Sequence, residues 1–232
     1  MRLLLLSNST NYGGTFLGHA GAALRDFLGS GPGEALFVPY AAVRFPFDEF
    51  AQKVADRFGE FGWHIRPIHR EGDPRAAVAA AQAIVVGGGN TFQLIDRLQR
   101  EGLIEAIRAR VRSGAAYVGW SAGANIACPT LRTTNDMPIV EPPSFEALGL
   151  VPFQINPHYT AARIPNHGGE TRVERLLEFV TANPGAHVIG LPEGTMLRVD
   201  DGGMQLLGER PAVLLDTNGE QQQVAPGPFQ LR

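Results

Sequence analysis

The pentapeptide Gly119-Trp120-Ser121-Ala122-Gly123 is the part of the sequence with the clearest chemical meaning. An apolar run ends just before it and small residues follow it, which is the strand, turn and helix pattern of a nucleophile elbow. In such a turn the glycines leave room for a serine whose Oγ points into a cleft at the carboxyl edge of a sheet. We therefore predict Ser121 as a nucleophile. An ordinary glycine-rich connection is the alternative for the pentapeptide alone.

A serine hydroxyl is a poor nucleophile unless a neighbouring base removes its proton. The chain has six histidines, at positions 19, 64, 69, 158, 167 and 187. His158 lies in the polar loop 154–159, downstream of the serine, whereas His167 is followed by two glycines that suit a flexible turn. We predict His158 as the base.

A carboxylate must hold the other nitrogen of the imidazole. Glu193 directly follows an apolar segment and so lies at a carboxyl edge of the predicted sheet. Asp136, which lies between the serine and His158, would give the chain order Ser, Asp, His of the α/β-hydrolases. In that fold the histidine lies near the end of the domain, whereas another strand follows it here. We favour Glu193 and keep Asp136 as the second candidate.

Acyl transfer also requires hydrogen-bond donors for the developing oxyanion. The glycines 87–89 follow the apolar segment 83–86, precede a helix, and allow backbone N–H groups to approach a substrate closely. The Gly-Lys-Ser/Thr of a phosphate loop does not follow, and the later glycine of a dinucleotide-binding loop is missing. We predict the N–H groups of Gly89 and Ala122 as an oxyanion hole. A plain strand-to-helix turn is the alternative for the glycines alone.

Composition and motifs exclude several classes of protein. The sequence has no H-E-x-x-H, no paired Cys-x-x-Cys and no clustered Asp, Glu and His at ligand spacing, so we expect no metal and no cofactor. A net charge of −3 over 232 residues implies no surface for nucleic acid, and the apolar runs are too short to span a membrane. Cys128 is the single cysteine, and Leu3–Leu6 is too short for a secretory signal. We expect a soluble cytoplasmic protein.

The strands and helices that position these groups are predicted from short apolar runs that alternate with segments of helical periodicity. The runs expected to form buried strands are 3–6, 35–38, 63–65, 83–86, 116–118 and 188–191. Helices are expected over 16–28, 50–61 and 104–111, and Asp73-Pro74 is typical of a helix start. This alternation predicts an α/β fold with a doubly wound, mostly parallel sheet.

Two regions depart from the alternation. Residues 129–166 show no sustained periodicity, and a long irregular segment inside a compact domain is usually functional or mobile. After Pro192 the apolar runs 196–199, 204–207 and 212–215 predict an antiparallel hairpin that extends one sheet edge. Because no linker or internal repeat occurs, we expect residues 1–232 to form a single domain.

Several blocks, in the same order along the chain, resemble the peptidase E family of α-aspartyl dipeptidases. They are 3–10, 84–94, 119–125, 128–130, 132–140, 155–158, 169–172 and 190–194. The resemblance implies a flavodoxin-like fold similar to class I glutamine amidotransferases, with serine in the place of their cysteine. It also implies hydrolysis of Asp-X dipeptides, and we expect a serine exopeptidase that acts through an acyl-enzyme. We expect small peptides as its partners and a monomer or homodimer as its assembly.

The resemblance carries roles over to individual residues. The family's nucleophile maps to Ser121, its base to His158 and its oxyanion donors to Gly89 and Ala122. Both acidic positions have been argued for its acid, and we place it at Glu193 rather than Asp136. Arg172 matches the group that binds the aspartyl carboxylate of the substrate, and Asn90 matches a neighbour in that pocket.

Two other functions remain as alternatives. One is a different serine hydrolase on the same scaffold, such as an esterase or a cyanophycinase-like enzyme that acts on β-linked aspartyl polymers. The other is a non-catalytic binding protein that retains the cleft.

Overall fold

The leucines near the N-terminus form the centre of the fold. The computed structural model describes residues 1–163, 165–166, 168–216 and 219–231. Its first strand, β1 (Arg2–Leu6), has apolar side chains with no exposed surface because both faces of its sheet are covered. Since successive side chains of a strand point to opposite faces, Leu3 and Leu5 pack into one core and Leu4 and Leu6 into another.

Eight strands form the main sheet. Besides β1 they are β2 (Gly33–Val38), β3 (Trp63–Pro67), β4 (Ala83–Val86), β5 (Ala116–Trp120), β8 (Met196–Asp200), β9 (Gly203–Leu207) and β12 (Gly227–Phe229). Their order is β12-β9-β8-β1-β5-β4-β2-β3. The strands from β1 to β3 in this order run parallel, and those on the other side of β1 are antiparallel to their neighbours. The prediction of an α/β fold with an antiparallel hairpin at one edge is confirmed.

Helices cover both faces of the main sheet. One face packs against α3 (Pro74–Ala80), α4 (Thr91–Arg100), α5 (Ile104–Arg112) and the short α6 (Ala122–Asn125). The other face packs against α1 (Gly21–Leu28) and α2 (Phe47–Gly59). A 3-10 turn, η1 (Ile68–Arg70), follows β3. This two-sided covering explains why the inner parallel strands β4 and β5 are buried at every position.

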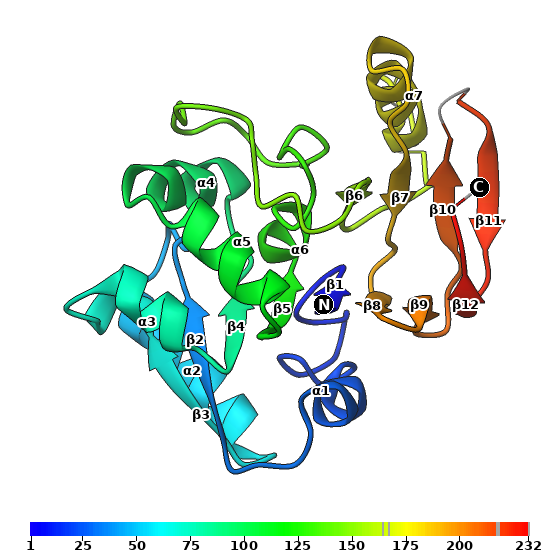
Figure 1. The fold of residues 1–232 in the computed structure, drawn as a ribbon. Coiled ribbons are helices and arrows are strands. Elements are labelled where there is room, and N and C mark those ends of the chain that lie inside the picture. Colours follow the sequence, from blue (N-terminus) through cyan, green and yellow to red (C-terminus); the bar gives the residue numbers. More distant parts are fainter. Residues whose placement is uncertain (164, 167, 217–218, 232) are drawn as a thin grey trace.

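A second sheet stands beside the first (Figure 1). Its strands are β6 (Gln154–Asn156), β7 (Val188–Gly190), β10 (Ala212–Leu215) and β11 (Gln221–Val224), in the order β11-β10-β7-β6. The helix α7 (Arg172–Ala182) packs on it, with Leu176 and Val180 against Val188 and Leu215. The runs 188–191 and 212–215 were therefore correctly predicted as strands, but they lie in this second sheet. An apolar run alone does not tell which sheet receives the strand.

Local differences from the predicted elements have simple causes. Helix α1 begins at Gly21 rather than Phe16, because Leu17 has a positive φ of 51° and the preceding residues form turns. The irregular segment 129–166 contains the strand β6, which is too short to show a period. The predicted start of α3 is confirmed, since Asp73 accepts a hydrogen bond from Ala76 N at 3.0 Å. In the part of the chain that the structure describes, no helix is long and apolar enough to cross a membrane.

Candidate active site

Ser121 lies in the sharp turn between β5 and α6. Its backbone has φ 52° and ψ −112°, a conformation that residues with a side chain rarely adopt. Neighbouring backbone groups hold it there: its N–H donates to Leu6 O at 3.1 Å, and its carbonyl accepts from Asn125 N at 2.9 Å. The turn has the strained geometry of a nucleophile elbow, and the serine lines a cavity.

Packing requires the two glycines of the pentapeptide. A Cβ on Gly119 would lie 2.3 Å from the carbonyl oxygen of Gly123, and a Cβ on Gly123 would lie 2.2 Å from that of Val86. Larger residues would therefore push α6 away from β4 and β5. The same close packing brings the glycine-rich loop to the serine, since a Cβ on Gly88 would lie 3.0 Å from Ser121 Cβ.

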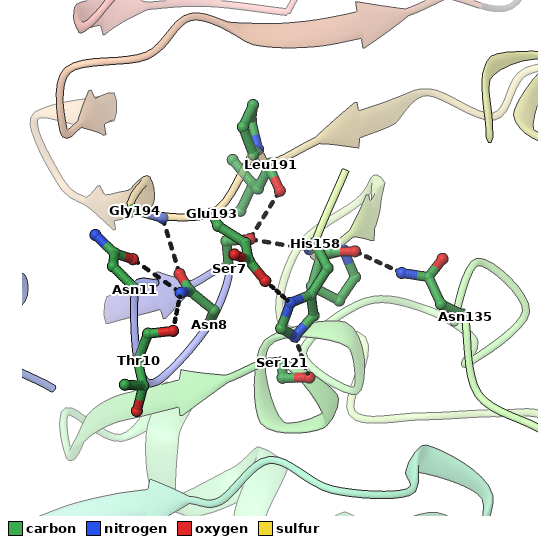
Figure 2. Close-up of polar contacts among 12 residues, drawn as sticks. Ser7, Asn8, Thr10, Asn11, Ser121, Asn135, His158, Leu191, Glu193 and Gly194 are labelled. Atoms are coloured by element: carbon green, nitrogen blue, oxygen red, sulfur yellow. Dashed lines mark hydrogen bonds and ion pairs between the residues drawn. The ribbon is translucent and has the colours of Figure 1, made fainter. Parts of the chain in front are cut away.

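A serine hydroxyl, an imidazole and a carboxylate form one hydrogen-bonded chain (Figure 2). Ser121 Oγ lies 3.0 Å from His158 Nε2, and His158 Nδ1 lies 2.8 Å from Glu193 Oε1. Because a carboxylate only accepts hydrogen bonds, Nδ1 carries the proton and Nε2 is left to accept from the serine. A general base that takes a proton from serine needs this tautomer.

Two parallel strands of the second sheet bring the imidazole and the carboxylate together. β6 ends at Asn156, β7 ends at Gly190, and these two residues are paired in register. Parallel strands end at the same edge of a sheet, so the loops that follow them lie side by side. Leu191 N donates to Asn156 O at 2.9 Å just beyond the strands, which keeps the two loops in contact.

A polar turn after β1 anchors both loops, and our sequence reasoning did not assign it to the site. Ser7 Oγ accepts a hydrogen bond from His158 N at 2.9 Å and donates one to Leu191 O at 2.8 Å. Asn8 Oδ1 accepts from Gly194 N at 2.8 Å, next to the triad carboxylate (Figure 2). The available signal was a run of polar residues directly after a buried strand, at the edge where sites of α/β folds form.

The second acidic candidate, Asp136, is engaged elsewhere. Its Oδ2 accepts hydrogen bonds from Thr91 N at 2.7 Å, Thr91 Oγ1 at 2.6 Å and Thr134 Oγ1 at 3.1 Å. These contacts place the carboxylate at the beginning of α4, where it satisfies an amide that has no partner within the helix. Of the two candidates, the structure places only Glu193 in hydrogen-bond contact with His158.

The predicted oxyanion donors lie on the two segments that meet at the serine. Gly89 has a positive φ of 138°, and a Cβ there would lie 2.2 Å from Ala41 O, so only glycine fits. Ala122 is the residue after the serine and the first of α6. Neither N–H donates to a protein acceptor among the described residues, which leaves both available for a ligand.

A cavity of about 510 Å³ opens beside Ser121 and His158. Part of its lining is the glycine-rich loop at Gly88 and Gly89. The rest is mainly aromatic: Phe16, Phe45 and Phe50 come from the region around α1 and α2, and Trp120 is the last residue of β5. The cavity therefore combines an aromatic wall with the reactive groups, and the charged side chains of Glu49 and Lys53 also line it.

Arg172, the first residue of α7, lies in a different cavity of about 480 Å³. Its guanidinium donates to Asn135 Oδ1, and Asn135 Nδ2 donates to Pro157 O at 2.7 Å, directly before His158. Arg172 has no carboxylate within 4 Å among the described residues. Burial lowers the pKa of this half-buried guanidinium, and Arg175 acts in the same direction. It is thus a cation without a counter-charge, linked through one amide to the loop of the base.

The side chain of Asn90 forms hydrogen bonds that stabilise the fold next to the glycine-rich loop. Its Oδ1 accepts from Gln93 N at 3.0 Å and so caps α4, while its Nδ2 donates to Met137 O at 2.8 Å. The side chain connects the glycine-rich loop to the irregular segment, and one amide hydrogen remains for other partners.

No other histidine among the described residues is in hydrogen-bond contact with the serine. His64 lies near Glu34, and His69 lies near Asp48. His19 and His187 have ring nitrogens that are buried without a partner, and His167 lies outside the described residues. Within the described ranges, no group of three or more His, Cys, Asp or Glu side chains is placed to hold a metal ion.

Comparison with known proteins gives a consistent result. The sequence model of a family described as "Peptidase family S51" matches residues 3–207. A protein named Peptidase E from Nostoc sp. (strain PCC 7120) is 48% identical over 225 residues, which cover 97% of this chain and 93% of the relative. Peptidase E from Salmonella typhimurium (strain LT2) is 50% identical over 202 residues, covering 87% of this chain and 88% of the relative.

One solved structure supports the fold. The crystal structure of a peptidase from an acI-B1 Actinobacterium superposes with a TM-score of 0.69, covering 98% of this chain and 95% of that one. Because the two sequences are only 20% identical, this similarity is evidence for the fold alone.

Proposed function

This chain belongs to peptidase family S51, and on that basis we propose that it is a serine exopeptidase that hydrolyses dipeptides beginning with aspartate. The observation that carries the proposal is the continuous hydrogen-bonded chain from Ser121 through His158 to Glu193. A hydroxyl, an imidazole and a carboxylate in this order can generate a nucleophile without a cofactor.

Acylation follows from this geometry. Ser121 Oγ attacks the aspartyl carbonyl carbon while its proton passes to His158 Nε2, and Glu193 stabilises the imidazolium that forms. The carbonyl oxygen becomes an oxyanion, which the free N–H groups of Gly89 and Ala122 can bind. The imidazolium then gives its proton to the departing amine, the C–N bond breaks, and the second residue leaves.

Deacylation uses the same groups, with water in the place of the departing amine. His158 takes a proton from a water molecule, the resulting hydroxide attacks the acyl carbon, and the proton returns to Ser121 Oγ as the ester bond breaks. Free aspartate is released and the starting hydrogen bonds are restored.

Arg172 supports the choice of aspartate. A half-buried guanidinium without a counter-charge is energetically unfavourable until an anion binds, and a guanidinium can bind a carboxylate through two parallel hydrogen bonds. Its hydrogen bond to Asn135, which also contacts Pro157 O, connects this cation to the base loop. We place the side-chain carboxylate of the first substrate residue there.

The test compares Asp-Leu, Asn-Leu, Glu-Leu and β-linked Asp-Leu with wild-type protein and with Ser121→Ala. We expect turnover of Asp-Leu well above the others and loss of at least about 10³-fold in kcat in the variant, which should remain folded. Faster turnover of simple esters or of the β-linked peptide would favour another serine hydrolase. No turnover, together with no labelling of Ser121 by a fluorophosphonate probe, would favour a binding protein.

A further inference from the structure

The aromatic cavity beside the serine contains a basic residue that the reaction described above does not use. Lys53, on α2, lines this cavity together with Ser121 and His158. It is the only lysine of the chain, in which the other 19 basic residues of the 20 are arginines. Its Nζ lies 4.5 Å from the centroid of the Phe16 ring and has no acidic partner within 4 Å among the described residues. The ammonium is therefore available to bind an anion in the cavity.

The aromatic wall is continuous and largely fixed. Trp120 packs edge-to-face against Phe16 and Phe50, with ring centroids 5.9 and 6.2 Å apart. Phe45 packs edge-to-face on Phe50 at 5.2 Å and is 44% exposed, so it forms the outer end of the wall. Such a surface favours an apolar group and orients it by contact with the rings.

The direction of the substrate follows from the two cavities. The cavity of Arg172 and the cavity of Lys53 share no lining residue, and only the second one is lined by Ser121 and His158. A peptide whose first side chain reaches Arg172 has its scissile carbonyl at Ser121. The cavity that Ser121 and His158 line is then the space that the residue after the scissile bond can enter.

We propose that the aromatic cavity is the subsite for the second residue of the dipeptide, with Lys53 binding its terminal carboxylate and the aromatic wall binding an apolar side chain. The inference rests on the proposed function, because it requires a substrate cleaved at Ser121. It adds a preference that the triad and Arg172 do not explain: a free carboxylate and an apolar side chain in the leaving residue.

Glu49 gives the proposal an internal control. It precedes Lys53 by one helical turn on α2 and lines the same cavity, yet no ion pair forms between the two. Its negative charge opposes a bound carboxylate, whereas the ammonium attracts it. Removal of each charge must therefore change the recognition of the carboxylate in opposite directions.

The experiment measures kcat/KM for Asp-Leu and for Asp-Leu-amide, which has the same scissile bond but no terminal carboxylate. We expect the wild-type protein to prefer Asp-Leu by roughly two- to fivefold, the range of a partly exposed ion pair. Lys53→Met should abolish that preference by lowering kcat/KM for Asp-Leu more than for the amide, and Lys53→Arg should retain most of it. Glu49→Gln should increase it. Arg44→Met, which removes an exposed charge that does not line the cavity, should have little effect.

A second comparison tests the aromatic wall. Phe45→Ala should lower kcat/KM for Asp-Phe about threefold or more relative to Asp-Gly, because less apolar surface is covered in the complex. An unchanged ratio of Asp-Leu to Asp-Leu-amide in Lys53→Met would overturn the inference while leaving the proposed function intact. An equal loss on both substrates would also overturn it, because Lys53 would then act on the acyl half. Failure of the wild-type protein to cleave either substrate would instead reject the proposed function.

Discussion

The buried hydroxyl of Ser7 accepts the backbone N–H of His158 at 2.9 Å, across 151 positions of sequence. His158 has a positive φ of 53°, so its backbone needs such a partner to stay in place. We expect Ser7→Ala to lower kcat about tenfold or more with KM within about twofold, since a small displacement of the base impairs proton transfer. Steady-state kinetics at a temperature where circular dichroism shows the intact fold provides the measurement.

Ser113→Ala is a suitable control for this prediction. It removes an exposed hydroxyl at the end of α5 that donates a hydrogen bond to Arg110 O in the same helix. A parallel rise of KM in Ser7→Ala, or a kcat equal to that of the control, would mean that Ser7 does not position the base.

The strained backbone of Ser121 makes a separate prediction about stability. At φ 52° and ψ −112° a residue with a side chain costs about 1–3 kcal/mol, whereas glycine adopts the conformation without that cost. Ser121→Gly and Ser121→Ala should both be inactive, but the glycine variant should be more stable by about 1 kcal/mol in urea unfolding, after its larger chain entropy is counted. Equal or lower stability of the glycine variant would show that the turn holds no strain.

The roles of Glu193 and Asp136 can be distinguished by replacing each carboxylate with the corresponding amide. Glu193→Gln removes the charge that orients and stabilises the imidazolium, so we expect kcat to fall by roughly 10²–10⁴. Asp136→Asn leaves the hydrogen bonds of His158 intact and weakens the beginning of α4. It should cost about 1–2 kcal/mol of folding free energy and less than tenfold in kcat. A larger kinetic loss in Asp136→Asn than in Glu193→Gln would assign the catalytic acid to Asp136.

The positions of the three triad groups follow a rule that can be applied to a sequence. Ser121, His158 and Glu193 each come shortly after a strand. β6 and β7 are parallel strands of the second sheet, so the groups after their carboxyl ends meet at one edge, whereas Ser121 follows β5 of the main sheet. The strand before His158 is only three residues long and was hidden in a segment without periodicity. The neighbourhood of the histidine was thus predictable from its polar loop, but the parallel pairing of β6 with β7 was not.

Hydrogen bonds that side chains make between distant segments could not be predicted. Asn135 links Arg172 to Pro157 O, and Ser7 links His158 to Leu191 O, through single hydrogen bonds between residues far apart in sequence. Periodicity reports which face of an element is buried and carries no information on such bonds. The division into two sheets was not predicted for a related reason, since the apolar runs of β4 in the main sheet and β10 in the second sheet look alike in the sequence.

Arg172 gives a prediction about specificity. Arg172→Met removes a pair of charge-assisted hydrogen bonds and should lower kcat/KM for Asp-Leu by roughly 10²–10³. Arg172→Lys should recover little of this loss, because an ammonium cannot form two parallel hydrogen bonds. The rate for Asn-Leu should change much less, so the ratio of the two substrates is the measurement. Arg175→Met, which removes a neighbouring exposed cation of the same cavity, should change that ratio less than threefold. A comparable change in both variants would indicate a general field effect rather than direct recognition.

His19 predicts how stability depends on pH. Both of its ring nitrogens are buried without a partner among the described residues. Burial lowers the pKa of this histidine, and the charge of Glu193 opposes the shift only in part. In the unfolded chain its pKa returns to about 6.5, so below that pH the unfolded state binds more protons than the folded state. The free energy of unfolding should therefore fall as the pH decreases from 7.5 to 5.5.

The histidine's share of this slope can be isolated by substitution. His19→Phe removes the titrating group, so its unfolding free energy should decline less between pH 7.5 and 5.5 than that of the wild-type protein. Urea unfolding at several pH values measures both slopes. His64→Gln removes an exposed histidine and should leave the slope close to that of the wild-type protein. A steeper decline in His19→Phe than in the wild-type protein would mean that the folded state favours protonated His19, because the sign of the slope follows directly from which state binds the proton more tightly.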